Sequence, residues 1–400
     1  MVHTRFSQRE IILCLCSLIV SGCATVNVPN VAQEGYSVAD DERRMFKRAD
    51  EFAEEFDVSG HIHQNQELEQ YLNGLSQNLL SEQHKLSEIK IGVKVVNDPS
   101  LNAASLPNGR IYIHSGMLAA MDNEAQLATL LGHEMTHVFN RHALKQFRSL
   151  INKTAFMFAA SMVAAVAVGN SGAVLVQAGV ASSIYGYSQE MEYEADDEGF
   201  QMTVHNGYDP RESIKVFEHL KMNIEEEEIK QPFFFSTHPN VVSRIKKYTK
   251  LVEALPAEKQ NGKVNAAEFL VKVKAVVVNN IRLCLQTGMF KTAERNIDKY
   301  VQIYPQEATG FYYKGELYRQ RQDHGKKEKK RDKTPDYDEA LKAYEQAVNL
   351  DNGFALAYKG KGQILQKKGL LDEAKASFRK YLEVNPWADD KEYIEQFIKS

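Results

Sequence analysis

The chain has 400 residues, of which 43% are hydrophobic and 26% are charged, and its formal net charge at pH 7 is −4. This length exceeds what one small core requires, so we expect two domains with additional segments. The composition is that of a folded globular protein. Because the net charge is slightly negative, nucleic acid is not expected as a partner.

The N-terminal segment has the pattern of an export signal. A basic start precedes an apolar run over 11–20, which is too short to anchor a chain across a bilayer. The run leads into Ser21-Gly22-Cys23, which resembles the bacterial lipobox. We therefore expect a lipoprotein signal peptide over 1–22, lipidation of Cys23, and a tether over 23–40. An ordinary signal peptide with an incidental cysteine is the alternative.

The next segment is expected to contain helix and then strand. Residues 41–80 are charged and helical in pattern, whereas 88–96 are rich in β-branched residues and predict a strand. Asn108-Gly109 indicates a tight turn before a short strand over 110–114. A strand edge here would hydrogen-bond to an extended peptide, and simple sheet structure is an equal alternative.

A helix is predicted to begin near Asp122 or Asn123, both good N-cap residues. It has an apolar stripe at helical spacing and contains the string His133-Glu134-Met135-Thr136-His137. One helical turn separates the two histidines, so both imidazoles leave the same face and can bind one metal ion. Glu134 can act on a metal-bound water, as in zinc peptidases with the H-E-x-x-H motif.

Two apolar pieces follow, over 155–168 and 173–184. Each is shorter than the roughly 20 residues that a transmembrane helix needs. We interpret them as buried or cleft-covering helices. Contact with a membrane or an unfolded substrate, and a spanning hairpin, are the alternatives.

A catalytic zinc takes three protein ligands and keeps one position open. The best candidate for the third ligand is Glu192, in an acidic helical segment that also contains Asp196. These two residues share a helical face. One can bind the metal while the other accepts the ring N–H of a ligand histidine. A solvated acidic face is the alternative.

The C-terminal part contains an internal repeat. The repeated residues are Gly288, Ala293, Tyr300 and Pro305, which align with Gly369, Ala374, Tyr381 and Pro386. This order resembles the tetratricopeptide repeat, a unit of about 34 residues that packs two antiparallel helices. We predict a linker over 256–273 and a repeat domain over 274–400 that ends in a polar capping helix. A basic insertion over 324–334 reads as a solvated loop, with an anionic partner as the alternative. Cys284 is expected to be a buried small hydrophobe.

His133-Glu-x-x-His137 and Glu192-x-x-x-Asp196 together resemble the gluzincin peptidases related to the CAAX prenyl protease and HtpX. Residues 102–118 and 237–245 resemble the matching segments of that family. The resemblance implies that His238 stabilises the oxyanion, with Arg244 as a neighbouring support. A histidine at this place in the family can instead occupy the open position of the zinc and hold the enzyme latent, and His238 can also be structural.

The expected fold is mainly α (α+β), with a zincin-like metallopeptidase domain and a small β-sheet over 41–255, followed by an α-solenoid. The resemblance implies a zinc metalloendopeptidase with one Zn²⁺ per chain. Its substrates would be unfolded or misassembled envelope proteins, and its repeats would contact the outer-membrane assembly machinery. The expected location is the periplasm, with a lipid anchor in the outer membrane. The alternative is a mostly latent peptidase that acts as a repeat-based chaperone or assembly scaffold.

Overall fold

The computed structural model of the chain describes residues 38–150, 187–227, 241–328 and 336–400. In chain order its elements are α2 (Asp40–Asp57), α3 (Gln66–Leu79), α4 (Glu82–Lys85), β1 (Gly92–Val96), β2 (Ala103–Ser105), β3 (Arg110–His114), α5 (Ser115–Ala120), α6 (Glu124–Phe139), α9 (Gln189–His205), α10 (Glu212–Glu227), α12 (Val241–Glu253), η1 (Ala257–Lys259), α13 (Ala266–Thr287), α14 (Phe290–Ile303), α15 (Ala308–Glu328), α16 (Asp336–Leu350), α17 (Ala355–Lys367), α18 (Leu371–Val384) and α19 (Lys391–Lys399). The predicted mainly α class with a small sheet is confirmed.

The sheet has the strand order β1-β3-β2, so β3 lies in the centre. β1 runs parallel to β3, and β2 pairs with β3 in antiparallel register, with Ala104 opposite Tyr112. The predicted tight turn at Asn108-Gly109 joins β2 to β3, and Gly109 has a φ of 90°, which favours glycine. The first strand is shorter than predicted, because only Gly92–Val96 pairs with β3.

The helix α6 occupies the centre of this body. It begins where the sequence predicted, since the side chain of Asn123 accepts a hydrogen bond from the backbone N–H of Gln126. Every residue of α6 is buried. The apolar stripe in the sequence predicted burial of one face only, and the structure buries the other faces as well. Several polar side chains of α6 are hydrogen-bonded inside the protein; Thr136, for example, donates to the carbonyl of Gly132.

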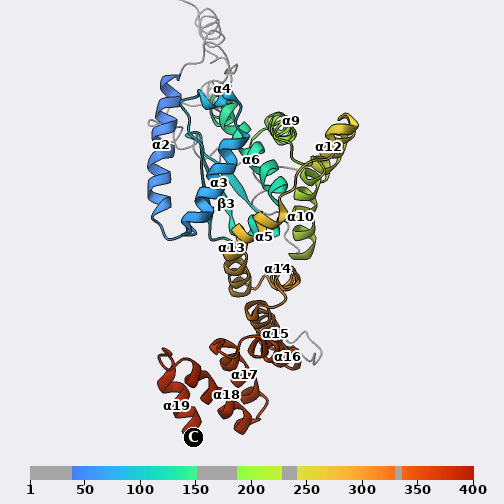
Figure 1. The fold of residues 1–400 in the computed structure, drawn as a ribbon. Helices are drawn as coiled ribbons and strands as arrows, with labels where there is room; N and C mark the ends of the chain where they lie inside the picture. The colour runs from blue at the N-terminus through green and yellow to red at the C-terminus, as the bar shows by residue number, and fades with distance from the viewer. Residues whose placement is uncertain (1–37, 151–186, 228–240, 329–335) are drawn as a thin grey trace, which may run out of the picture.

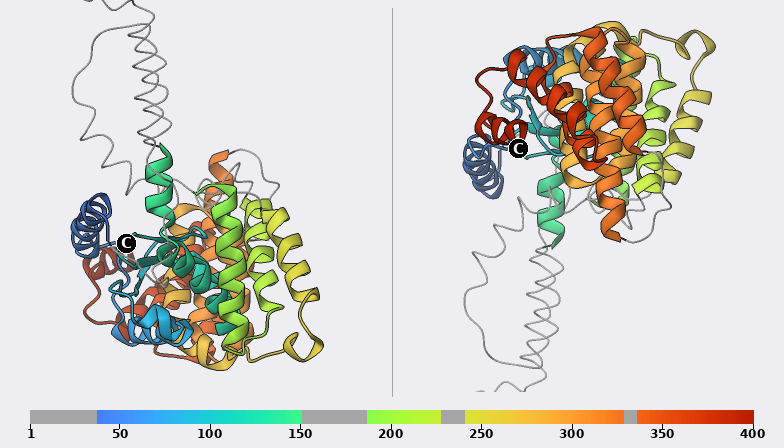
Figure 2. Two further views of the ribbon diagram at one scale, coloured as in Figure 1. Left: turned by 90° about the horizontal axis from the view of Figure 1, so that it is seen from above. Right: turned by 90° about the horizontal axis from the view of Figure 1, so that it is seen from below.

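Figure 1 shows α2 on one side of this central body and α10 and α12 on the other, and the view from above in Figure 2 agrees. The repeats from α15 onward lie below the body in Figure 1, with the C terminus at the far end. Within the described ranges, no helix combines the length and apolarity that crossing a membrane requires.

The helices from α13 to α18 form antiparallel pairs, and α19 covers the last pair, in the place where a capping helix was predicted. α13 already begins at Ala266, inside the segment expected to be a linker. Its side chains Phe269 and Val273 belong to the same apolar core as α6 and the sheet. Cys284 is fully buried, as predicted. The first helix pair is therefore packed as part of the central body.

Candidate metal centre

Two histidines of α6 form the first part of the site. His133 and His137 lie one turn apart, and their Nε2 atoms are 3.0 Å from each other. Their rings meet edge to face, at 4.7 Å between centroids and an interplanar angle of 81°. Both side chains are almost completely buried, and Glu134, between them in sequence, is 1% exposed. The helical spacing thus produces the convergence that the sequence predicted.

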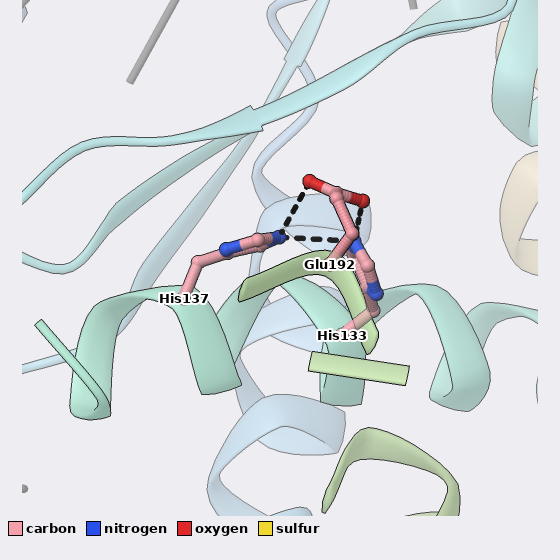
Figure 3. Close-up of side chains that lie close together, drawn as sticks. All are labelled: His133, His137 and Glu192. Carbon is pink, nitrogen blue, oxygen red and sulfur yellow. Dashed lines mark hydrogen bonds and ion pairs between the residues drawn. The ribbon is translucent and has the colours of Figure 1, made fainter. Parts of the chain in front are cut away.

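The third side chain comes from α9. Oε2 of Glu192 lies 3.6 Å from Nε2 of His133, and Oε1 lies 3.5 Å from Nε2 of His137. Figure 3 shows the carboxylate of Glu192 turned toward both imidazoles. Ser188 caps the N-terminus of α9, because its side chain accepts a hydrogen bond from the backbone N–H of Met191. The start of the helix fixed in this way places Glu192 over the two histidines.

Two glycines allow α9 to come this close to α6. A Cβ on Gly132 would lie 2.8 Å from the carbonyl oxygen of Gly199, and a Cβ on Gly199 would lie 2.6 Å from the backbone nitrogen of His133. Any larger residue would push the two helices apart. Close backbone packing at this crossing therefore sets the distance between Glu192 and the histidine pair.

This donor set fits a divalent metal ion such as zinc. One ligand atom from each of His133, His137 and Glu192 lies within 4.8 Å of the others, and all three residues are buried. Imidazole nitrogen and carboxylate oxygen are common zinc ligands at about 2.0–2.2 Å, so ligand atoms around one ion lie about 3 Å or slightly more from one another. The observed separations agree with this requirement, and three protein ligands leave a position open for substrate chemistry.

A buried charged group lies behind His133. Oδ1 of Asp196 lies 3.1 Å from Nδ1 of His133. The same carboxylate accepts hydrogen bonds from Nε of Arg244 (3.1 Å) and from the hydroxyl of Tyr248 (3.1 Å). Burial alone would raise the pKa of Asp196, but the charge of Arg244 and the hydrogen bond to His133 outweigh it and hold that pKa well below its ordinary value. Asp196 is thus a carboxylate that can hold the ring of His133 in place.

Arg244, which the family resemblance implied as a support near the oxyanion, is in contact with Asp196 and Glu192. It is 2% exposed, and one of its terminal nitrogens lies 3.7 Å from Glu192. Burial alone would lower the pKa of this guanidinium, but the carboxylates of Asp196 and Glu192 raise it above its ordinary value. The guanidinium carbon of Arg244 lies over the ring of Phe217, 4.3 Å from the ring centroid. This ring covers one face of the guanidinium.

A different set of groups lies behind His137. Nδ1 of His142 is 2.7 Å from Nδ1 of His137, and Nε2 of His142 is 3.1 Å from Oε2 of Glu194. Tyr187 stacks on His137, with 4.0 Å between ring centroids and an angle of 16°. Burial lowers the pKa of His142, and the hydrogen bond from His142 lowers the pKa of Glu194.

Sequence reasoning missed these three groups. His142 lacks ligand spacing to His137, and Glu194 is one of several acidic residues around Glu192, so neither stands out in the sequence. The sequence signal was weak, because a helix continued past His137 would not bring residue 142 back toward it. Two other histidines have partners away from this site: His114 bonds to Ser100, and His219 pairs with Asp122.

Several sequence predictions, including the signal peptide over 1–22, fall on other parts of the chain. Cys23, His238 and the apolar pieces over 155–168 and 173–184 lie outside the described residues.

The fold and site define a metallopeptidase-like domain with an attached helical repeat, and two family models match these two parts of the chain. The model of Peptidase family M48 matches residues 63–252, and a tetratricopeptide repeat model matches 356–386. The chain therefore contains a peptidase family M48 domain followed by a tetratricopeptide repeat.

Curated relatives match mainly over this domain. The chain is 27% identical over 184 residues to the β-barrel assembly-enhancing protease of Escherichia coli (strain K12), covering 44% of the chain and 37% of that protein. It is 30% identical over 165 residues to the mitochondrial metalloendopeptidase OMA1 of Schizosaccharomyces pombe, covering 40% and 47%. It is 29% identical over 233 residues to the mitochondrial metalloendopeptidase OMA1 of Danio rerio, covering 53% and 46%. The chain thus spans less than half the length of each of these relatives.

Proposed function

We propose that this protein is a zinc-dependent endopeptidase that holds one Zn²⁺ per chain with His133, His137 and Glu192. The observation that carries the proposal is the convergence of these three buried side chains from α6 and α9 around one point. The match to the peptidase family M48 model and the two kinds of metallopeptidase relatives support the same activity.

The chain's own residues would divide the work of peptide hydrolysis. A zinc ion held by the three ligands would supply Lewis acidity, which polarises the scissile carbonyl. Glu134, next to His133 on the buried helix, would take a proton from the attacking water and deliver it to the leaving amine. Asp196 would keep the ring of His133 oriented. His238 is proposed to stabilise the oxyanion, with Arg244 acting through Asp196 and Glu192 rather than on the substrate.

An extended peptide would bind along β2. This strand is at the edge of the sheet, and an unpaired edge offers backbone donors and acceptors to another strand. Ser105, the last residue of β2, lines the same small cavity as His137 and Tyr187, and the ring of Tyr187 stacks on His137. The edge therefore leads toward the metal ligands, as an endopeptidase requires.

We also propose the cellular setting from the sequence. The export signal and Cys23 favour a lipid-anchored protein of the bacterial periplasm, attached to the outer membrane. The substrates would be misfolded or stalled envelope proteins. The repeats would bring these clients, or outer-membrane assembly factors, to the peptidase. The name of the relative from Escherichia coli, a β-barrel assembly-enhancing protease, supports this choice.

One observation favours the second candidate, a mostly latent peptidase that serves as a chaperone or scaffold. His133, Glu134, His137 and Glu192 are each at most 2% exposed, so the groups must be uncovered before a protein substrate reaches them. A resting enzyme that opens only when a client binds would combine both functions.

The test is a cleavage assay on casein with metal analysis of each protein. Glu134→Gln is expected to abolish cleavage while zinc remains bound, because the amide cannot accept the water proton. The matched control is Glu345→Gln, an exposed glutamate on α16, which should cleave like the wild type. Unchanged cleavage by Glu134→Gln would refute the peptidase mechanism.

His238→Ala separates the two roles that the family resemblance allows. Higher activity would identify His238 as the group that holds the enzyme latent, and loss of activity with retained zinc would identify it as a catalytic group.

A further inference from the structure

The two ligand histidines are supported by different kinds of partner. Nδ1 of His133 faces the ion pair of Asp196 (3.1 Å) and Arg244 (3.0 Å), whereas Nδ1 of His137 faces a second imidazole, that of His142. His142 is in turn bonded to Glu194, whose other oxygen accepts a hydrogen bond from Asn140 (2.9 Å). This series of hydrogen bonds, from His137 through His142 to Glu194, thus connects the end of α6 to α9.

The backbone is shaped to bring His142 back to His137. α6 ends at Phe139, and Arg141 then adopts a left-handed conformation with a φ of 57°. This conformation is uncommon for a residue other than glycine and carries a conformational cost. It is held by the ion pair between Arg141 and Glu42 of α2, in which both side chains are at most 5% exposed. The reversal of the chain is therefore enforced by a buried contact.

The partners in this series of hydrogen bonds determine which ring nitrogen of each histidine carries a proton. A carboxylate only accepts, so Nε2 of a neutral His142 must carry the proton that faces Glu194. Nδ1 of His142 is then an acceptor, and the proton between the two Nδ1 atoms belongs to His137. A neutral His137 with its proton on Nδ1 has a lone pair on Nε2, which is the atom that faces Glu192 and His133.

We propose that His142 and Glu194 are positioning residues that fix the tautomer and ring orientation of His137, so that Nε2 of His137 is ready to bind the metal. The inference rests on the metal ligation in the proposed function and extends it to two residues outside the ligand set. Partners of this kind commonly change metal affinity by about 10- to 100-fold when removed.

The rival explanation is that His142 only fills space. Its ring is fully buried and lies 5.8 Å from Tyr187, so a packing role is a real alternative. Three substitutions separate the two explanations. His142→Asn places an amide near Nδ1 and can accept from His137. His142→Gln places an amide near Nε2 and serves only Glu194. His142→Phe keeps the ring volume and removes both hydrogen bonds.

The experiment is a chelator-competition titration of zinc on the full-length chain, repeated with cobalt to record the visible spectrum of the bound metal. His142→Phe and His142→Gln are expected to raise the zinc dissociation constant by about 10- to 100-fold and to change the cobalt spectrum. His142→Asn is expected to stay within a few-fold of the wild type. Glu194→Ala should weaken zinc binding, whereas the exposed matched control Glu190→Ala should not.

Wild-type affinity in His142→Phe would overturn the inference. If that variant does not fold, equal affinities in His142→Asn and His142→Gln would overturn it instead. A wild-type chain that binds no zinc would refute the proposed ligand set itself, so the two failures are distinguishable.

Discussion

The first and the last helix pairs of the repeat region share one local design but lie in different surroundings. Gly288 and Gly369 both end a helix with a positive φ, of 78° and 77°. Tyr300 and Tyr381 occupy the same place in their pairs and are both buried. Yet Tyr300 belongs to the apolar core that contains α6, whereas Tyr381 belongs to a small separate cluster closed by α19.

The comparison shows that a repeat motif specifies the helix pair itself but does not specify which other elements the pair packs against. The pair of α13 and α14 packs against the peptidase core, and polar contacts reinforce the join. Ser115 of α5 donates to Asn280 of α13 (2.9 Å, buried), and Nζ of Lys299 lies 2.9 Å from Asp122. The pair of α17 and α18 lacks such contacts among the described residues. The first pair therefore contributes to the stability of the core that contains α6, and the last pair does not.

Truncation should show the largest difference between the first and the last helix pair. A chain that ends at Leu255 loses α13 and α14 and exposes the apolar face of the central body that they cover. We expect it to lose cooperative folding and zinc binding, because burial of apolar surface is the main stabilising contribution. A chain that ends at residue 335 should keep both. Thermal unfolding followed by circular dichroism and a zinc titration would check this, and normal zinc binding by the shorter chain would contradict it.

A pair of core substitutions should have a smaller and more local effect. Phe269→Ala and Phe378→Ala each remove a ring that is at most 2% exposed, and each should cost about 3–5 kcal/mol in its own cluster. Only Phe269→Ala should lower the urea concentration at which bound zinc is released. Tyr393→Ala, at a side chain that is 68% exposed, is the control and should change stability by less than about 0.5 kcal/mol. Equal effects of the two phenylalanine variants on zinc release would show that the whole chain unfolds as one unit.

The smallest expected effect concerns two ion pairs and their pH dependence. Burial would raise the pKa of Asp122, but its hydrogen bond to His219 and the charge of Lys299 hold that pKa below its ordinary value. Asp390 is similar, since burial is outweighed by its bonds to Lys359 and Tyr381. A lowered pKa in the folded state stabilises the protein above the unfolded pKa of about 3.9, and this stability is lost as the pH falls through the folded pKa.

Asp122→Asn and Asp390→Asn should therefore each cost about 1 kcal/mol at pH 7, a small value because these carboxylates are 45% and 30% exposed. The difference from the wild type should shrink as the pH falls below about 3.9. Asp122→Asn should affect the zinc-releasing transition, and Asp390→Asn should affect only the C-terminal one. Urea titrations at several pH values measure both, and a difference that grows toward acid pH would contradict the assignment.

Much of the site was accessible from sequence because it depends on local geometry. A capped helix with histidines four residues apart must present both rings on one face, and the structure brings Glu192 to them as the chemistry required. His142 was out of reach because its position depends on the left-handed backbone of Arg141, which a buried partner on α2 stabilises. No periodic pattern encodes such a reversal.

The sequence by itself determined the helices, the turn at Gly109, the H-E-x-x-H spacing and the repeat of small and aromatic residues, because these follow from hydrogen bonding and periodicity within a short stretch of chain. Only the tertiary structure decided that α6 is enclosed on all sides, that α9 approaches it at Gly132 and Gly199, and that α13 belongs to the core of the peptidase. These features depend on which apolar surfaces meet across hundreds of residues, and that choice is made by packing the whole chain at once.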